Sequence, residues 1–173
     1  MVTEEIIETL DIREGAVEAD PGRDLLKVTV YERYGKGSRA LGFIRGFGLH
    51  AGAFAGSIGQ DSQNVVGVGV DDSDLAAAIN AVREMNGGVA VVHGEKVTML
   101  PLPIAGIMTD VGAAELAAGR AGIAAALREL GCAMSDPIFA LSLAITLVVI
   151  PALKMSNRGL VDVMAGEIVE LFV

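Results

Sequence analysis

The sequence predicts an α/β (α+β) protein, a mixed β-sheet with flanking helices in a single compact domain. Short segments rich in β-branched residues alternate with turn residues, as β-strands do. Two other segments carry apolar residues at helical spacing. The composition is 52% hydrophobic but 4% aromatic, so the core consists of aliphatic side chains, which suit a sheet covered by helices on both faces.

The first 24 residues are expected to form an N-terminal arm or edge strand, followed by a domain over residues 25–173. Glu4–Val17 mixes acids with scattered apolar residues, and Asp20–Arg23 is typical of a turn. Alternating apolar residues then predict four strands, at Leu25–Tyr34, Ala40–Arg45, Ala51–Ile58 and Asn64–Val70.

The second half of the domain alternates helices with strands. Asp71–Asp74 supplies the acids and hydroxyl that open a helix, and Gly87-Gly88 ends it. The remaining predictions, in chain order, are a hairpin of Val89–His93 and Lys96–Leu100, a helix at Val111–Leu130, a buried helix at Ile138–Val149 stopped by Pro151, a polar loop at Lys154–Arg158, and strands at Leu160–Val163 and Glu167–Val173.

Charge and composition exclude several classes of function. The net charge of −9 disfavours binding to nucleic acid or to an anionic membrane, since both need a basic patch. The apolar run Ile138–Leu153 is shorter than the ~20 residues of a membrane-spanning helix. The acidic N-terminus does not resemble a signal peptide, so a cytoplasmic protein is expected. The single cysteine, Cys132, is expected to be a buried structural thiol.

Polar residues gather within Gly46–Val70, a stretch that holds seven glycines. Between two strand-like segments lies a loop made of Gln60, Asp61, Ser62, Gln63 and Asn64. Polar side chains on a loop between rigid elements are typical of functional sites. The other interpretation is a tight surface turn whose Asp and Asn bond their own backbone, and the residues alone favour that turn.

Most chemical motifs are absent from the sequence. It contains neither a phosphate-binding Walker A motif nor a Gly-x-Ser-x-Gly nucleophile elbow. His50 and His93 are isolated, and two isolated histidines do not make a metal site. We therefore predict neither a catalytic residue nor a metal site within this chain.

Several longer motifs nevertheless resemble, in order, the carboxy-terminal domain of bacterial and archaeal adenine deaminases. They are Glu32-Arg33-Tyr34-Gly35, Gly46-Phe-Gly-Leu, Gly52-Ala53, Asp61-Ser62-Gln63-Asn64, Gly87-Gly88, Leu100-Pro-Leu-Pro-Ile-Ala-Gly106 and Ile150-Pro-Ala-Leu-Lys154 with Arg158-Gly-Leu-Val-Asp162. The resemblance covers roughly residues 25–173. It implies a role in hydrolysing adenine to hypoxanthine and ammonia, on a divalent metal (Mn, Fe or Zn) held by a separate amidohydrolase barrel.

The sequence departs from the family at three histidine positions. The family reads Ser-His-Asp-Ser-His-Asn where this chain has Gly59–Asn64, and Glu-Arg-His where Tyr34 stands, so Gln60, Gln63 and Tyr34 replace histidines. Glutamine keeps hydrogen-bonding capacity but does not titrate near neutrality. The resemblance makes six residues candidates for substrate binding or for an interface: Arg33, Gln60, Asp61, Ser62, Gln63 and Asn64.

Two hypotheses follow. In the first, the chain is the carboxy-terminal part of an adenine deaminase, as a fragment or as a subunit that pairs with a barrel and with the purine. In the second, it is a stand-alone, non-catalytic relative that binds a small ligand or another protein. Under either hypothesis we expect the isolated chain to be inactive. The mean hydropathy of +0.53 also predicts a homo-oligomer, because so apolar a chain exposes association surface.

Overall fold

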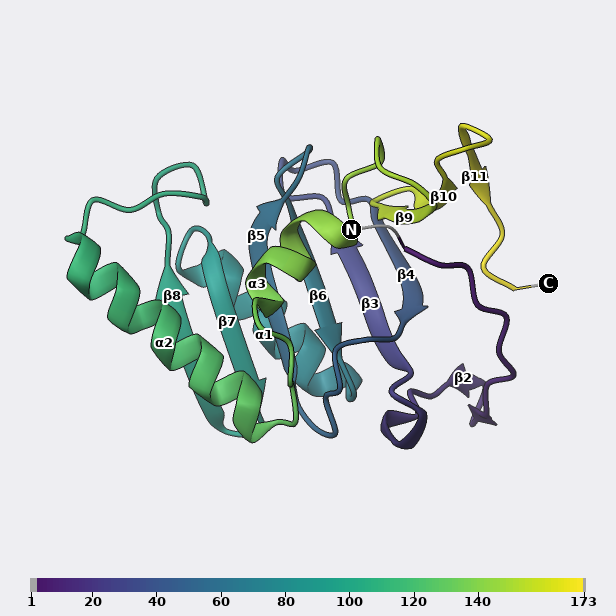
Figure 1. Ribbon diagram of the computed structural model, residues 1–173, viewed down its shortest axis with the longest axis horizontal. Helices are drawn as coiled ribbons and strands as arrows, with labels where there is room; N and C mark the ends of the chain where they lie inside the picture. Colours follow the sequence, from purple (N-terminus) through teal and green to yellow (C-terminus); the bar gives the residue numbers. More distant parts are fainter. Residues whose placement is uncertain (1–2, 173) are drawn as a thin grey trace.

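A computed structural model describes residues 3–172 and places one six-stranded sheet at the centre of the chain (Figure 1). The strand order is β4-β3-β6-β5-β7-β8, and every pairing is antiparallel. The predicted α/β class is confirmed, in its α+β form. The bounds are Leu26–Tyr31 for β3, Arg39–Ile44 for β4, Ala53–Gly59 for β5, Asn64–Gly69 for β6, Gly88–His93 for β7 and Lys96–Pro101 for β8.

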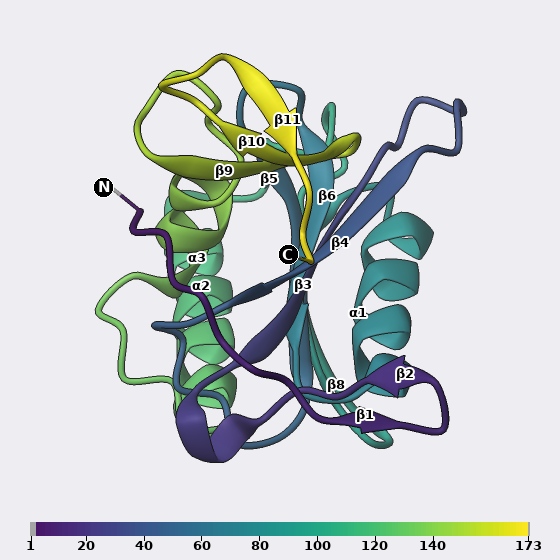
Figure 2. The same ribbon diagram turned by 90° about the vertical axis from the view of Figure 1, so that its right-hand side faces the viewer.

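Helices cover both faces of this sheet, as the composition predicted (Figure 2). Helix α1, Asp72–Glu84, packs on β5, β6 and β7. The opposite face carries α2, Ala113–Glu129, and the short helix α3, Pro137–Phe139, which continues as a π-helical turn, η2, over Ala140–Ala144. Alternating strand residues supply the two apolar layers, so that Val28 and Phe54 belong to the α2 side and Ala55 and Ala90 to the α1 side.

The predicted polar loop at Lys154–Arg158 is wrong. Leu153–Ser156 forms strand β9, which pairs with β10, Gly159–Asp162, and β10 pairs in turn with β11, Glu167–Val169. The polar sequence conceals a strand because the Met155 side chain packs into the core and the Lys154 side chain is also buried. The last strand ends earlier than predicted, and Val173 lies outside the described residues.

The helix predicted at Ile138–Val149 is also shorter than expected, since helical structure ends at Ala144. The Ile145 carbonyl accepts a hydrogen bond from the Met155 N–H at 2.8 Å, which binds this backbone to β9 instead of to a further helical turn. The Ser142 and Thr146 hydroxyls bond carbonyls three and four residues earlier, at 3.1 and 3.2 Å, and such bonds bend helices.

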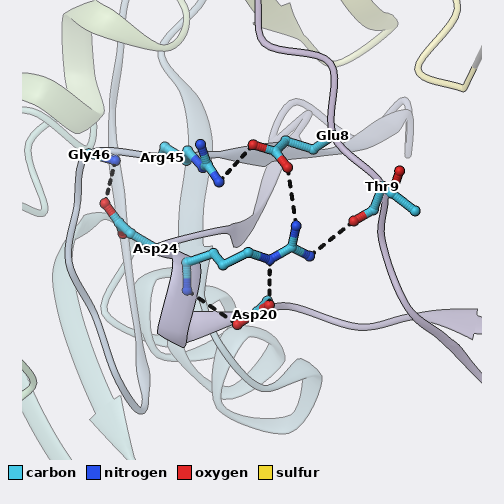
Figure 3. Close-up of polar contacts among 7 residues, drawn as sticks. Glu8, Thr9, Asp20, Asp24, Arg45 and Gly46 are labelled. Carbon is cyan, nitrogen blue, oxygen red and sulfur yellow. Dashed lines mark hydrogen bonds and ion pairs between the residues drawn. The ribbon is translucent and has the colours of Figure 1, made fainter.

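The N-terminal arm carries a hairpin of its own, in which β1, Ile12–Arg13, pairs with β2, Ala16–Val17, and neither strand joins the central sheet. The Glu8 carboxylate fastens the arm to the domain between two arginines, at 3.1 Å from Arg23 and 2.7 Å from Arg45 (Figure 3). Arg23 lies in the 3₁₀ turn Pro21–Arg23 and also bonds Asp20 at 2.6 Å. That bond lowers the pKa of the Asp20 carboxyl and raises the pKa of Arg23.

Within residues 3–172, no helix has the length and apolar character needed to cross a membrane.

Candidate functional site

The polar loop of the sequence lies at the end of the sheet where β5 turns into β6 (Figure 1). Gly59 and Asn64 face each other across this turn. A side chain at Gly59 would come within 2.6 Å of the Asn64 carbonyl, so the tight closure requires glycine. Gln63 adopts a left-handed backbone conformation, with φ 54°. The loop is thus a short, fixed turn that presents polar side chains.

Arg33 and Tyr34, from the connection between β3 and β4, lie beside this loop. The Tyr34 hydroxyl donates to the Ser62 carbonyl at 2.9 Å. The Arg33 guanidinium stacks 5.2 Å from the centre of the Tyr34 ring and donates to the Ala105 carbonyl at 2.6 Å. The structure therefore gathers all six candidate residues of the sequence at one end of the sheet.

The six candidate residues form a surface around the β5–β6 loop. Sequence reasoning missed two further residues of this β5–β6 loop surface, Ser38 and Asn157. Asn64 is 2% exposed, and its Nδ2 donates to Oδ1 of Asn157 at 3.2 Å. Asn157 donates in turn to the Ser38 hydroxyl at 2.7 Å. Neither Ser38 nor Asn157 carries a motif, and their association depends on β9, which the sequence did not predict.

The glycine-ended segment at Leu100–Gly106 also returns to this end of the sheet. The Ser57 hydroxyl, fully buried in β5, accepts from the Gly88 N–H at 2.8 Å and donates to the Gly106 carbonyl. Gly106 has φ 76°, and an added Cβ would lie 1.9 Å from Arg33 Nη1. Gly106 therefore leaves the space that the Arg33 guanidinium occupies.

Some buried polar atoms of this surface make no hydrogen bond. Within residues 3–172, three of them have no partner: Gln63 Oε1, Asn64 Oδ1 and Arg33 Nε. A buried polar atom without a partner costs about 1–3 kcal/mol. Asp61 and Ser62 are exposed. The loop's own bonds use Gln60 N–H, which donates to Ser142 at 3.0 Å, the Ser62 carbonyl and Asn64 Nδ2, rather than the Asp61 carboxylate.

The surface is not a small-molecule cavity. The crevice that begins at Gly59 and runs between β5 and η2 has no room for a water molecule. Among the described residues, His, Cys, Asp and Glu side chains do not gather in groups of three that would hold a metal ion. Cys132 is buried, as predicted, and burial raises the pKa of its thiol. Such a thiol is a poor nucleophile.

Fold and site together define a small α+β domain that presents exposed polar side chains at one end of an antiparallel sheet. Its residues 1–167 match the family model of the adenine deaminase C-terminal domain. The chain belongs to that family.

Curated relatives agree with this assignment. The chain is 47% identical over 163 residues to an adenine deaminase of Oleidesulfovibrio alaskensis, 40% identical over 171 residues to one of Methanothermobacter thermautotrophicus and 46% identical over 153 residues to one of Archaeoglobus fulgidus. These matches cover 93, 99 and 88% of the chain but 28, 32 and 27% of the relatives. The chain thus spans about a third of their length.

Proposed function

We propose that this chain serves as the C-terminal domain of an adenine deaminase, docking through the β5–β6 loop surface onto a metal-binding amidohydrolase barrel. In this proposal the barrel hydrolyses adenine to hypoxanthine and ammonia, and this chain holds the barrel in position. The exposed Asp61 carboxylate carries the proposal, because the loop's own hydrogen bonds do not use it and a docked partner can reach it. The family membership supports the rest of an adenine deaminase as that partner.

The divalent metal (Mn, Fe or Zn) belongs to the barrel in this proposal. The described residues do not fit a metal, since their potential ligands are not grouped. What this chain offers the barrel is hydrogen bonding: carboxylate and amide oxygens on the loop, and the Arg33 guanidinium behind them. The closed crevice at Gly59 favours a protein surface as the partner over a purine held by this chain alone.

A chimera tests the proposal. In the adenine deaminase of Oleidesulfovibrio alaskensis, this chain replaces the C-terminal region that it matches. Hypoxanthine formation is then compared among the chimera, the relative without that region, and this chain alone with Mn, Fe or Zn. We expect activity in the chimera, little in the truncated relative and none in this chain.

Two results would contradict the proposal. A chimera no more active than the truncated relative would show that the chain does not serve the barrel. Calorimetric binding of adenine or hypoxanthine to this chain alone, lost in Asp61→Asn, would favour the stand-alone ligand-binding module instead.

A further inference from the structure

Lys154, on strand β9, is a buried lysine that has no counter-ion among residues 3–172. The residue is 2% exposed and belongs to the largest fully buried side chains of the domain. Within residues 3–172 it takes part in none of the ion pairs. A lysine is rarely buried unless a charged group accompanies it, because desolvating an ammonium is costly.

The hydrogen bonds of Lys154 do not replace that counter-ion. Its ammonium has three N–H donors and bonds the Thr3 hydroxyl at 3.1 Å and, weakly, the Pro151 carbonyl at 3.5 Å. Both acceptors are neutral and shared, since the Thr3 oxygen also accepts from the Ala152 N–H at 3.1 Å and the Pro151 carbonyl from the Thr3 N–H at 3.3 Å. Burial lowers the pKa of the Lys154 ammonium.

Lys27 shows what a satisfied buried lysine looks like in the same fold. It is 8% exposed and lies on β3, yet its ammonium forms an ion pair with Asp72 at 2.7 Å. Among the residues that the structure describes, Lys27 has a carboxylate partner and Lys154 has none. An acid is therefore the missing partner at Lys154.

The position of Lys154 indicates where that acid comes from. Lys154 is three residues before Asn157, so about 10 Å along the strand separates it from the Asn64–Asn157 contact of the candidate docking surface. A docked domain that extends this far along β9 would meet Lys154 where Thr3 now lies. Among residues 3–172, Thr3 is the arm residue that bonds the ammonium, and residues 4–7, which follow Thr3, are exposed.

We propose that Lys154 is a second docking point for the catalytic barrel, and that a carboxylate of the barrel takes the place of the Thr3 hydroxyl on its ammonium. The inference rests on the proposed function and adds to it the chemistry of one contact. It requires an Asp or Glu on the barrel face opposite β9.

Lys154→Met tests the inference by the sign of its effect in two settings. In the isolated chain it removes an uncompensated charge and keeps the apolar stem, so the melting temperature should rise by about 2–4 °C. In the chimera it leaves the barrel's carboxylate without its lysine partner, so the half-life of deaminase activity at elevated temperature should fall at least about tenfold. The matched control is Lys27→Met, which should raise stability in neither protein.

Each other outcome overturns the inference. A lower melting temperature in both proteins means that Lys154 is only a structural hydrogen-bond donor, and higher stability in both means that no carboxylate reaches it. Failure of the proposed function is distinguishable, because the chimera with the unsubstituted chain would then already lack activity, and the inference would fall with it.

Discussion

Asn64 Nδ2 donates to Asn157 Oδ1 at 3.2 Å, joining the β5–β6 loop to the β9–β10 turn across 93 positions of the chain. Asn157 bonds Ser38 as well, so one side chain ties three connections together at this end of the sheet. The loop is therefore held by the small sheet of β9, β10 and β11 and not only by its own turn.

Removing this link should destabilise the domain. Asn157→Ala leaves the Asn64 amide, which is 2% exposed, without its side-chain partner. We expect a loss of about 1–3 kcal/mol in the free energy of unfolding, measured with urea. The control is Arg158→Ala at the exposed neighbouring position, which should stay within about 0.5 kcal/mol. Equal effects at the two positions would contradict a specific role for Asn157.

The main sheet was predictable from sequence because its strands carry strong local signals. Val, Ile and Ala segments punctuated by glycine marked β3 to β8, and acids followed by an apolar face marked α1. The small sheet was only partly predictable. Lys154 and Ser156 read as loop residues, and only tertiary packing around Met155 reveals the strand.

The candidate site was predictable to the same extent. A loop dense in polar residues gave Gln60–Asn64, and the family motifs gave Arg33. The contacts with Asn157, Ser57 and Gly106 depend on the pairing of segments far apart in the chain, which no local pattern encodes. The homo-oligomer and the cytoplasmic location stay predictions.

Gly106→Ala should damage both the backbone and Arg33. The φ of 76° disfavours any side chain, and the new Cβ would lie 1.9 Å from Arg33 Nη1. We expect the free energy of unfolding, measured with urea, to fall by about 1–3 kcal/mol. Gly112→Ala is the matched control, with φ −62° and open space around an added Cβ. In the double variant with Arg33→Ala part of the loss should return, and a fully additive result would rule out the contact.

Asp61→Asn should show whether Asp61 closes the turn or binds the barrel. Asp61 is exposed, and the loop's own hydrogen bonds do not use its carboxylate, so the isolated chain should keep its melting temperature. In the chimera, loss of a charged hydrogen bond to the barrel should reduce kcat/KM by the equivalent of about 1–3 kcal/mol. A lowered melting temperature of the isolated chain, with unchanged activity of the chimera, would assign Asp61 to the turn alone.

Lys154 should also make the stability of the isolated chain depend on pH in the alkaline range. Its pKa in the folded chain is lowered by burial from an ordinary value of 10.5, which it regains on unfolding. Between these two values the unfolded chain holds the proton that the folded chain has released, so stability rises with pH there. Below the folded pKa both states are protonated, and the cost of the buried charge is fully present.

The difference between the unsubstituted chain and Lys154→Met isolates this effect, because other titrating groups are common to both. Urea unfolding from pH 7 to just above 10 should find Lys154→Met the more stable protein at pH 7, with the gap narrowing as the pH rises. Lys27→Met, whose ammonium is paired with Asp72 in the unsubstituted chain, should not show that narrowing. A gap that is constant or widens with pH would mean that the Lys154 ammonium is solvated in the folded chain, and that it has no need of a carboxylate from the barrel.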